Sequence, residues 1–342
     1  MKAVFFERFG GPEVLRYGER PDPVAGPGEA LVRVRACGIN HLDLWVRAGL
    51  PGLDPEMPHI LGNDIAGEFA AVGPGVRHLV PGQKTLVNPT LSCGVCAVCA
   101  NGDDHLCRSY DVIGRGRNGG NAELVTVPAV NCLPYPENLS WEEAAAVPLV
   151  FLTAWHMLVT RARVRPGEDV LVIGAGSGVG SAAIQVARLH GARVIATAGG
   201  PVKLERARAL GAHELIDHAS EDIAKRTREL TGRKGADIVV EHVGGSVFEA
   251  GVAALARNGR LVTCGATAGG KANLDLNVLF GRHLTLLGSW MGRRSDLNDA
   301  LWHVARGALK PVVDSVRPLA EARAAHERIE AREHFGKLVL VP

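Results

Sequence analysis

The sequence lacks the charge features that mark several specialised classes of protein. It has no run of five like charges, and its 38 basic and 36 acidic side chains leave a formal net charge of +2. Proteins that bind nucleic acid or membrane surfaces by charge usually carry a basic stretch or patch. We therefore expect neither a nucleic-acid partner nor a membrane partner, and a small molecule as the substrate.

Long hydrophobic runs are missing as well. The longest apolar stretch, residues 144–160, contains Pro148 and His156 and is shorter than a membrane span. The first residues, MKAVFFERFGGPEV, show neither the apolar core nor the small-residue cleavage site of a signal peptide. We expect a cytoplasmic protein, and 342 residues are enough for two domains.

Cysteine is scarce, but it is concentrated in one segment. Four of the seven cysteines lie in SCGVCAVCANGDDHLC (92–107), with the spacing C-x2-C-x2-C-x7-C. Four thiolates complete a tetrahedral zinc shell and leave no position for a substrate. An iron–sulfur cluster or unpaired buried thiols are the alternatives, although no proline follows the last cysteine as in ferredoxin-type motifs. We predict one structural zinc, bound by Cys93, Cys96, Cys99 and Cys107.

The two parts of the chain show different secondary-structure patterns. Up to about residue 150, short alternating β signals such as GEALVRVRACGI (28–39) and DIAGEFAAVGPGV (64–76) indicate a barrel-like all-β domain. Residues 168–199 then predict a buried strand, a glycine turn, an amphipathic helix and a second strand. Further strands are expected in 213–217, 235–245 and 259–267. Strands that alternate with helices indicate βαβ units on a parallel sheet.

A literal G-x-G-x-x-G motif is absent, because Val179 stands where the third glycine is expected after Gly174 and Gly176. The segment GAGSGVG nevertheless follows a buried strand and opens a helix. Small residues there allow a pyrophosphate to approach the backbone, and the helix N-terminus favours its charge. We predict a dinucleotide site; a tight turn that serves only helix packing is the alternative.

The end of the second strand bears on the choice of cofactor. NAD-preferring sites place an acidic residue there, on the ribose diol. The segment VIATAGGPVK (194–203) has no Asp or Glu, and Lys203 is close enough in sequence to reach a 2′-phosphate. His218, near the end of the third strand, is a candidate to flank the adenosine. We predict NADP(H) over NAD(H); a surface role for the lysine is the alternative.

The sequence resembles the medium-chain dehydrogenase/reductase superfamily over its whole length. The segments that carry the resemblance are GGPEVL (10–15), GPGEALVRVRACGIN (26–40), VGPGV (72–76), LTAW (152–155), GSGVGSAAIQVA (176–187) and GRLVTCG (259–265). It implies an α/β fold with a GroES-like β-rich catalytic domain and a Rossmann cofactor-binding domain. The expected bounds are 1–150 with 289–342 for the catalytic domain, with its zinc lobe at about 90–110, and 151–288 for the Rossmann domain.

Zinc alcohol dehydrogenases of this superfamily bind a catalytic zinc, and its ligand positions can be sought in this chain. The pattern G-V-C-H-T-D falls on Gly38 to Asp43, the pattern G-H-E falls on Gly62 to Asp64, and the remaining ligand cysteine falls on Leu149. Asn40, Asn63 and Leu149 thus replace the three ligands, and amides and alkyl groups bind zinc poorly. The asparagine resembles the zinc-free quinone oxidoreductase branch. A rearranged site that uses Asp64, His41 or His59 remains open.

Without zinc, hydrogen-bond donors must polarise the acceptor carbonyl. Asn40 is the candidate donor to an oxyanion, with His41 and Asp43 as candidate proton-relay groups. The resemblance implies that Asn40, Thr153 and the pair Gly288-Ser289 lie near the nicotinamide. His41 as an ordinary residue at a helix start and Thr153 as an N-cap are the alternatives. The residues expected to contact the cofactor are Gly176, Ser177, Gly178, Val179, Thr197, Lys203, His218, Val243, Gly265, Ser289 and Lys337.

Three functions fit these residues. The first is an NAD(P)H-dependent reductase that transfers hydride to a quinone, an enone or another activated carbonyl such as an aldehyde. The second is an alcohol dehydrogenase with an atypical catalytic site. The third is a nucleotide-binding relative without turnover. The resemblance also implies a homodimer or homotetramer formed through residues 272–289.

Overall fold

The computed structural model describes residues 1–342 and divides the chain into two compact units. The first unit contains Met1–Leu149 and Arg293–Pro342, and the second contains Val150–Gly292. The sequence places the boundaries after residues 150 and 288, within a few residues of these positions. Each unit is described by itself below.

The second unit contains a six-stranded parallel sheet with the strand order β13-β12-β11-β14-β15-β16. This is the strand order of a Rossmann fold. Successive strands are added on one side of the first strand and then, from the fourth strand on, on its other side, and ligands of such folds bind where the order switches. The strands are β11 (Asp169–Val172), β12 (Arg193–Ala198), β13 (Glu214–Asp217), β14 (Ala236–Glu241), β15 (Leu255–Thr263) and β16 (Thr285–Gly288). The predicted Rossmann domain is confirmed.

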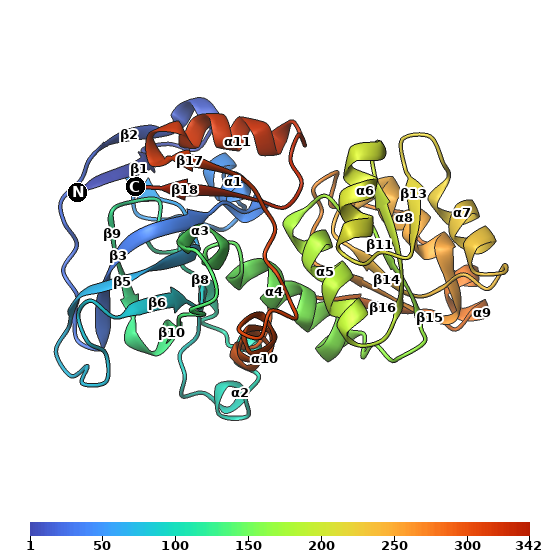
Figure 1. Ribbon diagram of the computed structural model, residues 1–342, viewed down its shortest axis with the longest axis horizontal. Helices are drawn as coiled ribbons and strands as arrows, with labels where there is room; N and C mark the ends of the chain where they lie inside the picture. The colour runs from blue at the N-terminus through green and yellow to red at the C-terminus, as the bar shows by residue number, and fades with distance from the viewer. The chain divides into compact units, whose positions relative to one another are not determined.

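Helices cover both faces of this sheet (Figure 1). Helices α5 and α6 contact β11, β12 and β13, α8 contacts β14 and β15, and α7 contacts α8 and β13. Leu171, Ile195 and Val239 are fully buried between these layers. The helices of this unit are α4 (Pro148–Trp155), which begins at the boundary, the π-helical segment η4 (His156–Arg161), α5 (Gly178–Leu189), α6 (Pro201–Ala209), α7 (Ile223–Leu230), α8 (Gly245–Ala254) and α9 (Leu276–Gly281).

The first unit is the predicted β-rich domain, and the end of the chain completes it. Its seven-stranded sheet has the order β10-β6-β5-β3-β18-β17, with β9 paired to β3. The last strand, β18, pairs antiparallel with β3, so Val339 lies opposite Gly38. The strands of this sheet are β3 (Glu29–Gly38), β5 (Asp64–Val72), β6 (Lys84–Val87), β9 (Leu124–Pro128), β10 (Cys132–Pro134), β17 (Val313–Pro318) and β18 (Lys337–Val341).

Short elements close the rest of the first unit. A three-stranded sheet has the order β2-β1-β4, and β7 pairs with β8 beside the cysteine segment. These strands are β1 (Lys2–Phe6), β2 (Arg16–Glu19), β4 (His59–Ile60), β7 (Thr90–Leu91) and β8 (Asp111–Val112). The helices are η1 (Pro12–Val14), α1 (His41–Ala48), α2 (Ala97–Ala100), η2 (Asp104–Leu106), η3 (Ala129–Asn131), α3 (Trp141–Ala144), α10 (Arg294–Val304), η5 (Leu319–Glu321) and α11 (Ala322–Glu330).

One helical stretch, Trp141–Arg161, is long and apolar enough to cross a membrane by length and composition alone. In the structure, 83% of its most apolar window is buried inside the protein. This burial is typical of a core helix, and the segment packs within the fold.

Candidate active site and metal centre

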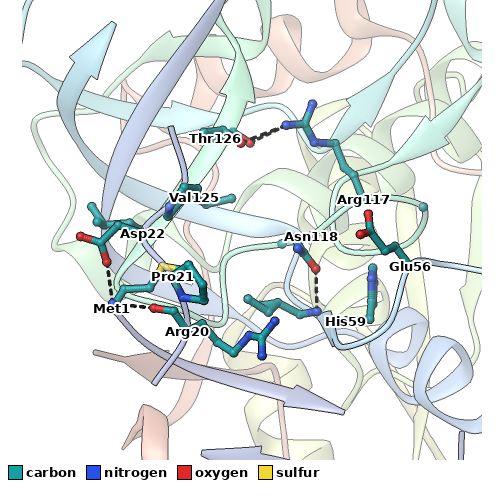
Figure 2. Close-up of a pocket in the computed structure, with 15 residues that line it drawn as sticks. Met1, Arg20, Pro21, Asp22, Glu56, His59, Arg117, Asn118, Val125 and Thr126 are labelled. Carbon is teal, nitrogen blue, oxygen red and sulfur yellow. Dashed lines mark hydrogen bonds and ion pairs between the residues drawn. The ribbon is translucent and has the colours of Figure 1, made fainter. Parts of the chain in front are cut away.

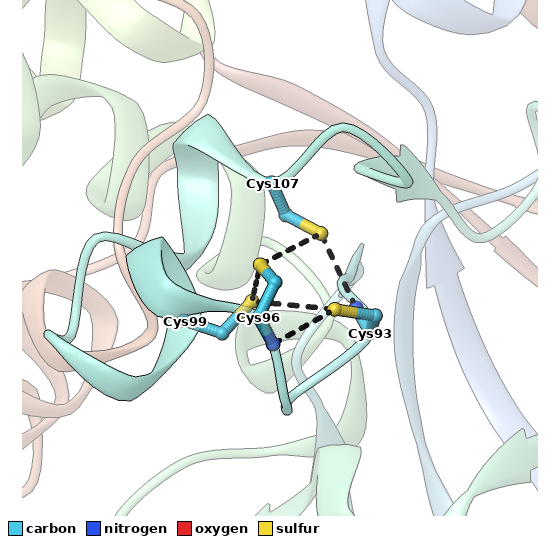
Figure 3. A group of neighbouring side chains, drawn as sticks. All are labelled: Cys93, Cys96, Cys99 and Cys107. Atoms are coloured by element: carbon cyan, nitrogen blue, oxygen red, sulfur yellow. Dashed lines mark hydrogen bonds between the residues drawn. The ribbon is translucent and has the colours of Figure 1, made fainter.

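The four cysteines converge in the segment between β7 and β8 (Figure 3). Their sulfur atoms all lie within 4.8 Å of one another. The separations are 3.5 Å between Cys96 and Cys99, and 3.9 Å both between Cys93 and Cys99 and between Cys96 and Cys107. Zinc–sulfur bonds of about 2.3 Å in a tetrahedron place sulfur atoms about 3.8 Å apart. The donors and their spacing therefore fit one zinc ion with four thiolate ligands.

Backbone groups support the same arrangement. The N–H of Cys96 donates to Cys93 Sγ over 3.4 Å, and the N–H of Cys93 donates to Cys107 Sγ over 3.5 Å. Hydrogen bonds from the N–H groups of Val95 and Cys96 lower the pKa of the Cys93 thiol to about 6. The lobe is also anchored by an ion pair of 2.6 Å between Arg293 and Asp103. We call residues 90–110 the cysteine lobe.

A second group of polar side chains is buried in the first unit, at the positions of the missing catalytic ligands. We call it the Lys337 cluster, and it comprises Asn40, Asp43, Asn63, Asp64 and Lys337. Asn40 precedes α1, Asp64 begins β5 and Lys337 begins β18, so three separate elements meet here. Every member of the cluster is at most 7% exposed.

The ammonium group of Lys337 lies at the centre of the cluster. Its ammonium donates to Asp64 Oδ2 over 2.9 Å, to Asn40 Oδ1 over 2.5 Å and to the carbonyl oxygen of Ile39 over 2.7 Å. An ammonium has three N–H donors, and all three are engaged here. The sequence predicts Lys337 as a cofactor contact, whereas in the structure its donors bind groups of its own unit.

The structure also changes the role available to Asn40. Its Nδ2 donates to Asn63 Oδ1 over 2.6 Å and to Asp64 Oδ2 over 2.8 Å. A carboxamide has two N–H donors, so neither remains for an oxyanion. In this arrangement Asn40 holds the cluster together, and the predicted donation to a substrate would require one of these hydrogen bonds to break.

Asp43 is also a structural member of the cluster. It is fully buried, and it accepts hydrogen bonds from the N–H of Asn40 over 2.7 Å and from that of Gly62 over 3.0 Å. The first of these belongs to a capping box at the start of α1. Burial raises the pKa of Asp43 to about 6, although the two backbone N–H groups oppose the rise. The predicted proton relay would therefore need a path to a carboxylate that is sealed from solvent.

His41 lies at the first position of α1, and its ring packs edge-on against that of Trp45. It is the more exposed of the two predicted relay groups, since it is half-buried whereas Asp43 is buried.

The third ligand position, Leu149, contributes its backbone to the cluster. Its N–H donates to Asp64 Oδ1 over 2.8 Å, so both oxygens of this carboxylate are bound. His59, a candidate for a rearranged metal site, is hydrogen-bonded through Nε2 to the carbonyl group of Gly114 over 3.1 Å. The only group of three or more His, Cys, Asp or Glu side chains close enough to bind one metal ion is that of the cysteine lobe.

The glycine turn of the second unit connects β11 to α5. Ser177 is the N-cap of α5, and its Oγ accepts from the N–H of Gly180 over 2.8 Å. The N–H groups of Gly178 and Val179 are in the first helical turn, where no intrahelical acceptor exists. A Cβ on Gly180 would lie 2.2 Å from the carbonyl oxygen of Gly174, so only glycine fits there. The turn has the free N–H groups and the small residues that a pyrophosphate requires.

His242 directly follows β14, the strand that pairs with β11, and its side chain contacts this turn. Its Nε2 lies 2.9 Å from Ser177 Oγ, and burial lowers its pKa to about 4. The imidazole is therefore neutral at physiological pH. Sequence analysis did not select His242, because it lies 65 residues from Ser177 in the chain.

The adenosine end of the expected cofactor site is at the ends of β12 and β13. Thr197 Oγ1 accepts from the N–H of Gly174 over 3.2 Å and lies 3.2 Å from His218 Nδ1. Thr197, His218 and the glycine turn thus meet; the sequence predicts cofactor contacts at all three. Asp217, which the sequence did not suggest, accepts hydrogen bonds from the N–H groups of Gly200 and Ala219. Lys203 lies in the first turn of α6.

The ends of β14 and β15 lie on the other side of the point where the strand order reverses. Glu241 is fully buried, and it accepts hydrogen bonds from the N–H groups of Val243 and Gly244 and from Thr263 Oγ1. These bonds fix the backbone that leads to Val243, which the sequence predicts beside the cofactor. Gly265 follows β15, where a Cβ would lie 2.9 Å from the carbonyl oxygen of His242.

Two buried hydroxyls in the second unit have no protein partner. Thr153 Oγ1 and Ser289 Oγ are shielded from solvent and form no hydrogen bond. Thr153 is in the interior of α4, which begins at Pro148, so it is not the N-cap of that helix. Buried hydroxyls usually find a partner, and an unpaired one suggests a ligand or water. Both residues were predicted to lie beside the nicotinamide, and these atoms fit a polar group there.

A pocket of about 460 Å³ opens in the first unit (Figure 2). In this pocket the terminal ammonium of Met1 binds Asp22, and Arg117 donates to the carbonyl oxygen of Thr126. Of the candidate site residues, only His59 lines this pocket.

Comparisons with known proteins agree on one family. A family model described as alcohol dehydrogenase GroES-like domain matches residues 26–137, and one described as zinc-binding dehydrogenase matches residues 178–306. The chain is 35% identical to an alcohol dehydrogenase of Geobacillus stearothermophilus, covering 99% of both chains. It is 31% identical to a quinone oxidoreductase of Pseudomonas aeruginosa, covering 100% of this chain and 99% of the relative. A crystal structure of an NAD-dependent alcohol dehydrogenase superposes with a TM-score of 0.97 at 49% identity, covering 100% of both chains.

Proposed function

The chain belongs to the medium-chain dehydrogenase/reductase superfamily and is an oxidoreductase, and we propose that it transfers hydride from NAD(P)H to a quinone, an enone or another activated carbonyl without a catalytic zinc. In this proposal the cysteine lobe holds one structural zinc. The substrate is a small molecule, as for the named relatives.

The Lys337 cluster is the observation that carries the proposal. A zinc ion in that position would need free anionic or imidazole ligands, but Asn40 and Asn63 are neutral amides. Asp64 is the only carboxylate bound to the ammonium of Lys337, at 2.9 Å. A metal cation there would be repelled by a buried ammonium, whose charge is screened much less than at the surface.

The second unit supplies the proposed cofactor site. The N–H groups of Gly178 and Val179 would bind the pyrophosphate, and Thr197 and His218 would flank the adenosine. When bound, the reduced nicotinamide supplies the hydride, and a proton from His41 or water completes the reduction of the acceptor. Thr153 and Ser289 would donate to polar atoms at the nicotinamide end, since their hydroxyls have no partner within the protein.

The choice between NAD(H) and NADP(H) depends on the charged groups near the end of β12. The missing acidic residue on β12 predicts NADP(H), and Lys203 supports that prediction. The carboxylate of Asp217 on the neighbouring strand opposes it. We therefore propose NAD(P)(H) as the cofactor and Asp217 as the group that discriminates between the two forms.

We also propose that the protein is cytoplasmic and that two copies associate through residues 272–289. This segment contains α9 and the edge strand β16, and Leu276 and Phe280 expose 63% and 67% of their surface. An exposed edge of a sheet beside apolar side chains favours pairing with a second chain.

The alternative is an alcohol dehydrogenase with an atypical catalytic site. It is favoured by the 49% identity to the NAD-dependent alcohol dehydrogenase of known structure. In that case an atypical, labile second zinc would activate the alcohol, or a polar group of the protein would accept its proton.

The test combines zinc content with activity on both classes of substrate. Zinc per chain is measured before and after mild chelation, and the oxidation of NADH and NADPH is followed with a quinone and with an enone. The reduction of NAD⁺ and NADP⁺ is followed with a set of alcohols. We expect one tightly bound zinc and a reductase activity that chelation leaves unchanged. Two zinc ions, with alcohol oxidation lost together with the labile one, would establish the alternative.

A further inference from the structure

The end of β12 carries no acidic side chain, but the structure brings a carboxylate to the same place from the next strand. In the register of the parallel sheet, Ala198, the last residue of β12, lies opposite Asp217, the last residue of β13. Neighbouring strands are about 4.8 Å apart, so Asp217 is one strand away from the position where Rossmann folds place the acidic residue that binds the ribose.

Hydrogen bonds aim this carboxylate at the turn that follows β12. Asp217 Oδ1 accepts from the N–H of Gly200 over 3.2 Å and from that of Ala219 over 3.0 Å. The hydrogen bonds from Ala219 and Gly200 also lower the pKa of Asp217, so the group is ionised at neutral pH. The carboxylate thus carries a full negative charge directly beside the Gly199–Gly200 turn.

The turn itself offers little that would bind a phosphate. Gly199 and Gly200 have no side chains, and nothing lies within 4 Å of a Cβ built on Gly200. Gly200 is the N-cap of α6, and a helix N-terminus normally attracts an anion. Asp217 already binds the N–H of Gly200, so this anion-binding position is occupied by a carboxylate of the protein.

From this geometry we propose that Asp217 determines cofactor specificity, by hydrogen bonding to the hydroxyls of the adenosine ribose and repelling a 2′-phosphate, so that the protein prefers NAD(H). This inference rests on the proposed function, because it takes the cofactor site of the second unit as given. It reverses the preference for NADP(H) that β12 alone predicts. Lys203 and the dipole of α6 attract a phosphate, and Asp217 offsets that attraction.

The substitution Asp217→Asn tests the charge and keeps the local structure. The amide side chain retains an oxygen that accepts from Gly200 and Ala219, so the turn keeps its hydrogen bonds while the negative charge is lost. Glu214→Gln is the matched control. Glu214 begins the same strand, its loss changes the net charge equally, and three residues of strand place it about 10 Å from Asp217.

Binding of NAD⁺ and NADP⁺ to the full chain is measured by calorimetry, which requires no substrate. We expect the wild type to bind NAD⁺ at least about tenfold more tightly, since like charges in contact repel strongly. Asp217→Asn should reduce this ratio about tenfold, mainly through tighter binding of NADP⁺, and Glu214→Gln should change it less than twofold. If Asp217→Asn unfolds the protein, Asp217→Ser gives the same comparison with a hydroxyl as the acceptor.

Two results would overturn the inference but leave the proposed function standing. One is a wild type that binds NADP⁺ more tightly, and the other is a ratio that Asp217→Asn leaves unchanged or shifts no more than Glu214→Gln does. A wild type that binds neither dinucleotide would overturn the proposed function, and the inference with it.

Discussion

The cysteine lobe and the Lys337 cluster both surround a place for one positive charge, but they differ in where that charge comes from. The side chains that converge in the lobe are four thiols, with no ammonium group among them, and Cys93 is exposed. The Lys337 cluster lies in the interior, and its cation is an ammonium of the chain that pairs with Asp64 at 2.9 Å. The difference supports the proposal that the lobe binds a metal from solution, whereas a lysine of the chain supplies the positive charge of the cluster.

The comparison also explains why the two groups are built from different residue types. Four converging thiolates repel one another unless a metal neutralises them, and soft thiolates suit zinc. The amides are neutral, the carboxylate of Asp64 balances the ammonium of Lys337, and burial raises the pKa of the second carboxylate, Asp43, to about 6. A buried ion pair of this kind costs desolvation free energy, which good hydrogen bonds to the remaining polar atoms offset.

The largest expected effect concerns the lobe and its metal. Cys99→Ser should reduce the zinc content from one ion per chain to none, because three thiolates leave the shell incomplete. Structural zinc sites bind with apparent free energies of about 10–16 kcal/mol in small peptides, so the lobe should lose its fold. Elemental analysis gives the zinc content, and limited proteolysis within residues 90–110 reports the fold of the lobe.

Cys132→Ser is the control for this substitution. Cys132 is a half-buried thiol of β10 that is not among the four converging cysteines. It should leave the zinc content and the proteolysis pattern unchanged. Zinc retained by Cys99→Ser would contradict the assignment of the lobe as a four-thiolate site.

The second-largest effect is expected from removing the buried ammonium of Lys337. Lys337→Met should lower the free energy of unfolding by about 3–5 kcal/mol, because it leaves the Asp64 carboxylate buried without a counter-charge. Denaturant unfolding measures the change. The double variant Lys337→Met/Asp64→Asn should recover much of the loss, since it removes the unpaired charge as well.

Lys2→Met is the surface control, because Lys2 pairs with Glu19 at 3.0 Å while the two side chains are 42% and 83% exposed. Exposed pairs of this kind contribute little to stability, because water and salt screen them. If Lys337→Met costs no more than Lys2→Met, the ammonium does not hold the cluster together.

The smallest effect concerns the protonation of Asp43. Burial raises its pKa from 3.8 to about 6, so the folded state binds the proton more tightly than the unfolded state does. Its contribution to stability is therefore fully present below about pH 4 and is lost as the pH rises to about 6, with an upper bound of about 3 kcal/mol.

The measurement is the free energy of unfolding of the wild type minus that of Asp43→Asn, taken from pH 4 to pH 7. The amide that replaces the carboxyl group in this variant does not titrate, so the other carboxylates cancel in the difference. The difference should fall between pH 4 and pH 6 and then stay level. A difference that rises over this interval would show that the buried carboxylate is stabilised as an anion.

Local patterns in the sequence were enough for the fold class and for much of the site. The glycine turn between a buried strand and a helix predicted the Rossmann unit, and alternating strands predicted the β-rich unit. The cysteine spacing predicted that four thiols meet at one point, as they do in the structure. These features are readable because the interacting residues lie within about 20 positions of one another, where spacing alone limits the geometry.

The sequence could not predict the contacts between residues that lie far apart in the chain. Strand β16 and the pairing of β17 with β18 have weak local signals, and tertiary contacts define them. His242 was not predicted because no pattern links it to Ser177. Only the packed structure reveals that the two amide hydrogens of Asn40 bind Asn63 and Asp64, so the predicted donation to an oxyanion would require one of these bonds to break.

By itself, then, the sequence determined which chemistry is absent: no histidine or cysteine stands at the three ligand positions, so those positions lack the groups that bind zinc well. The tertiary structure decided what replaces that chemistry. It brings Lys337 to Asp64 across 273 residues and pairs Asp217 with the end of β12. Charge neutralisation in the interior depends on distance in space and not on distance along the chain, and sheet register sets that distance only once the chain has folded.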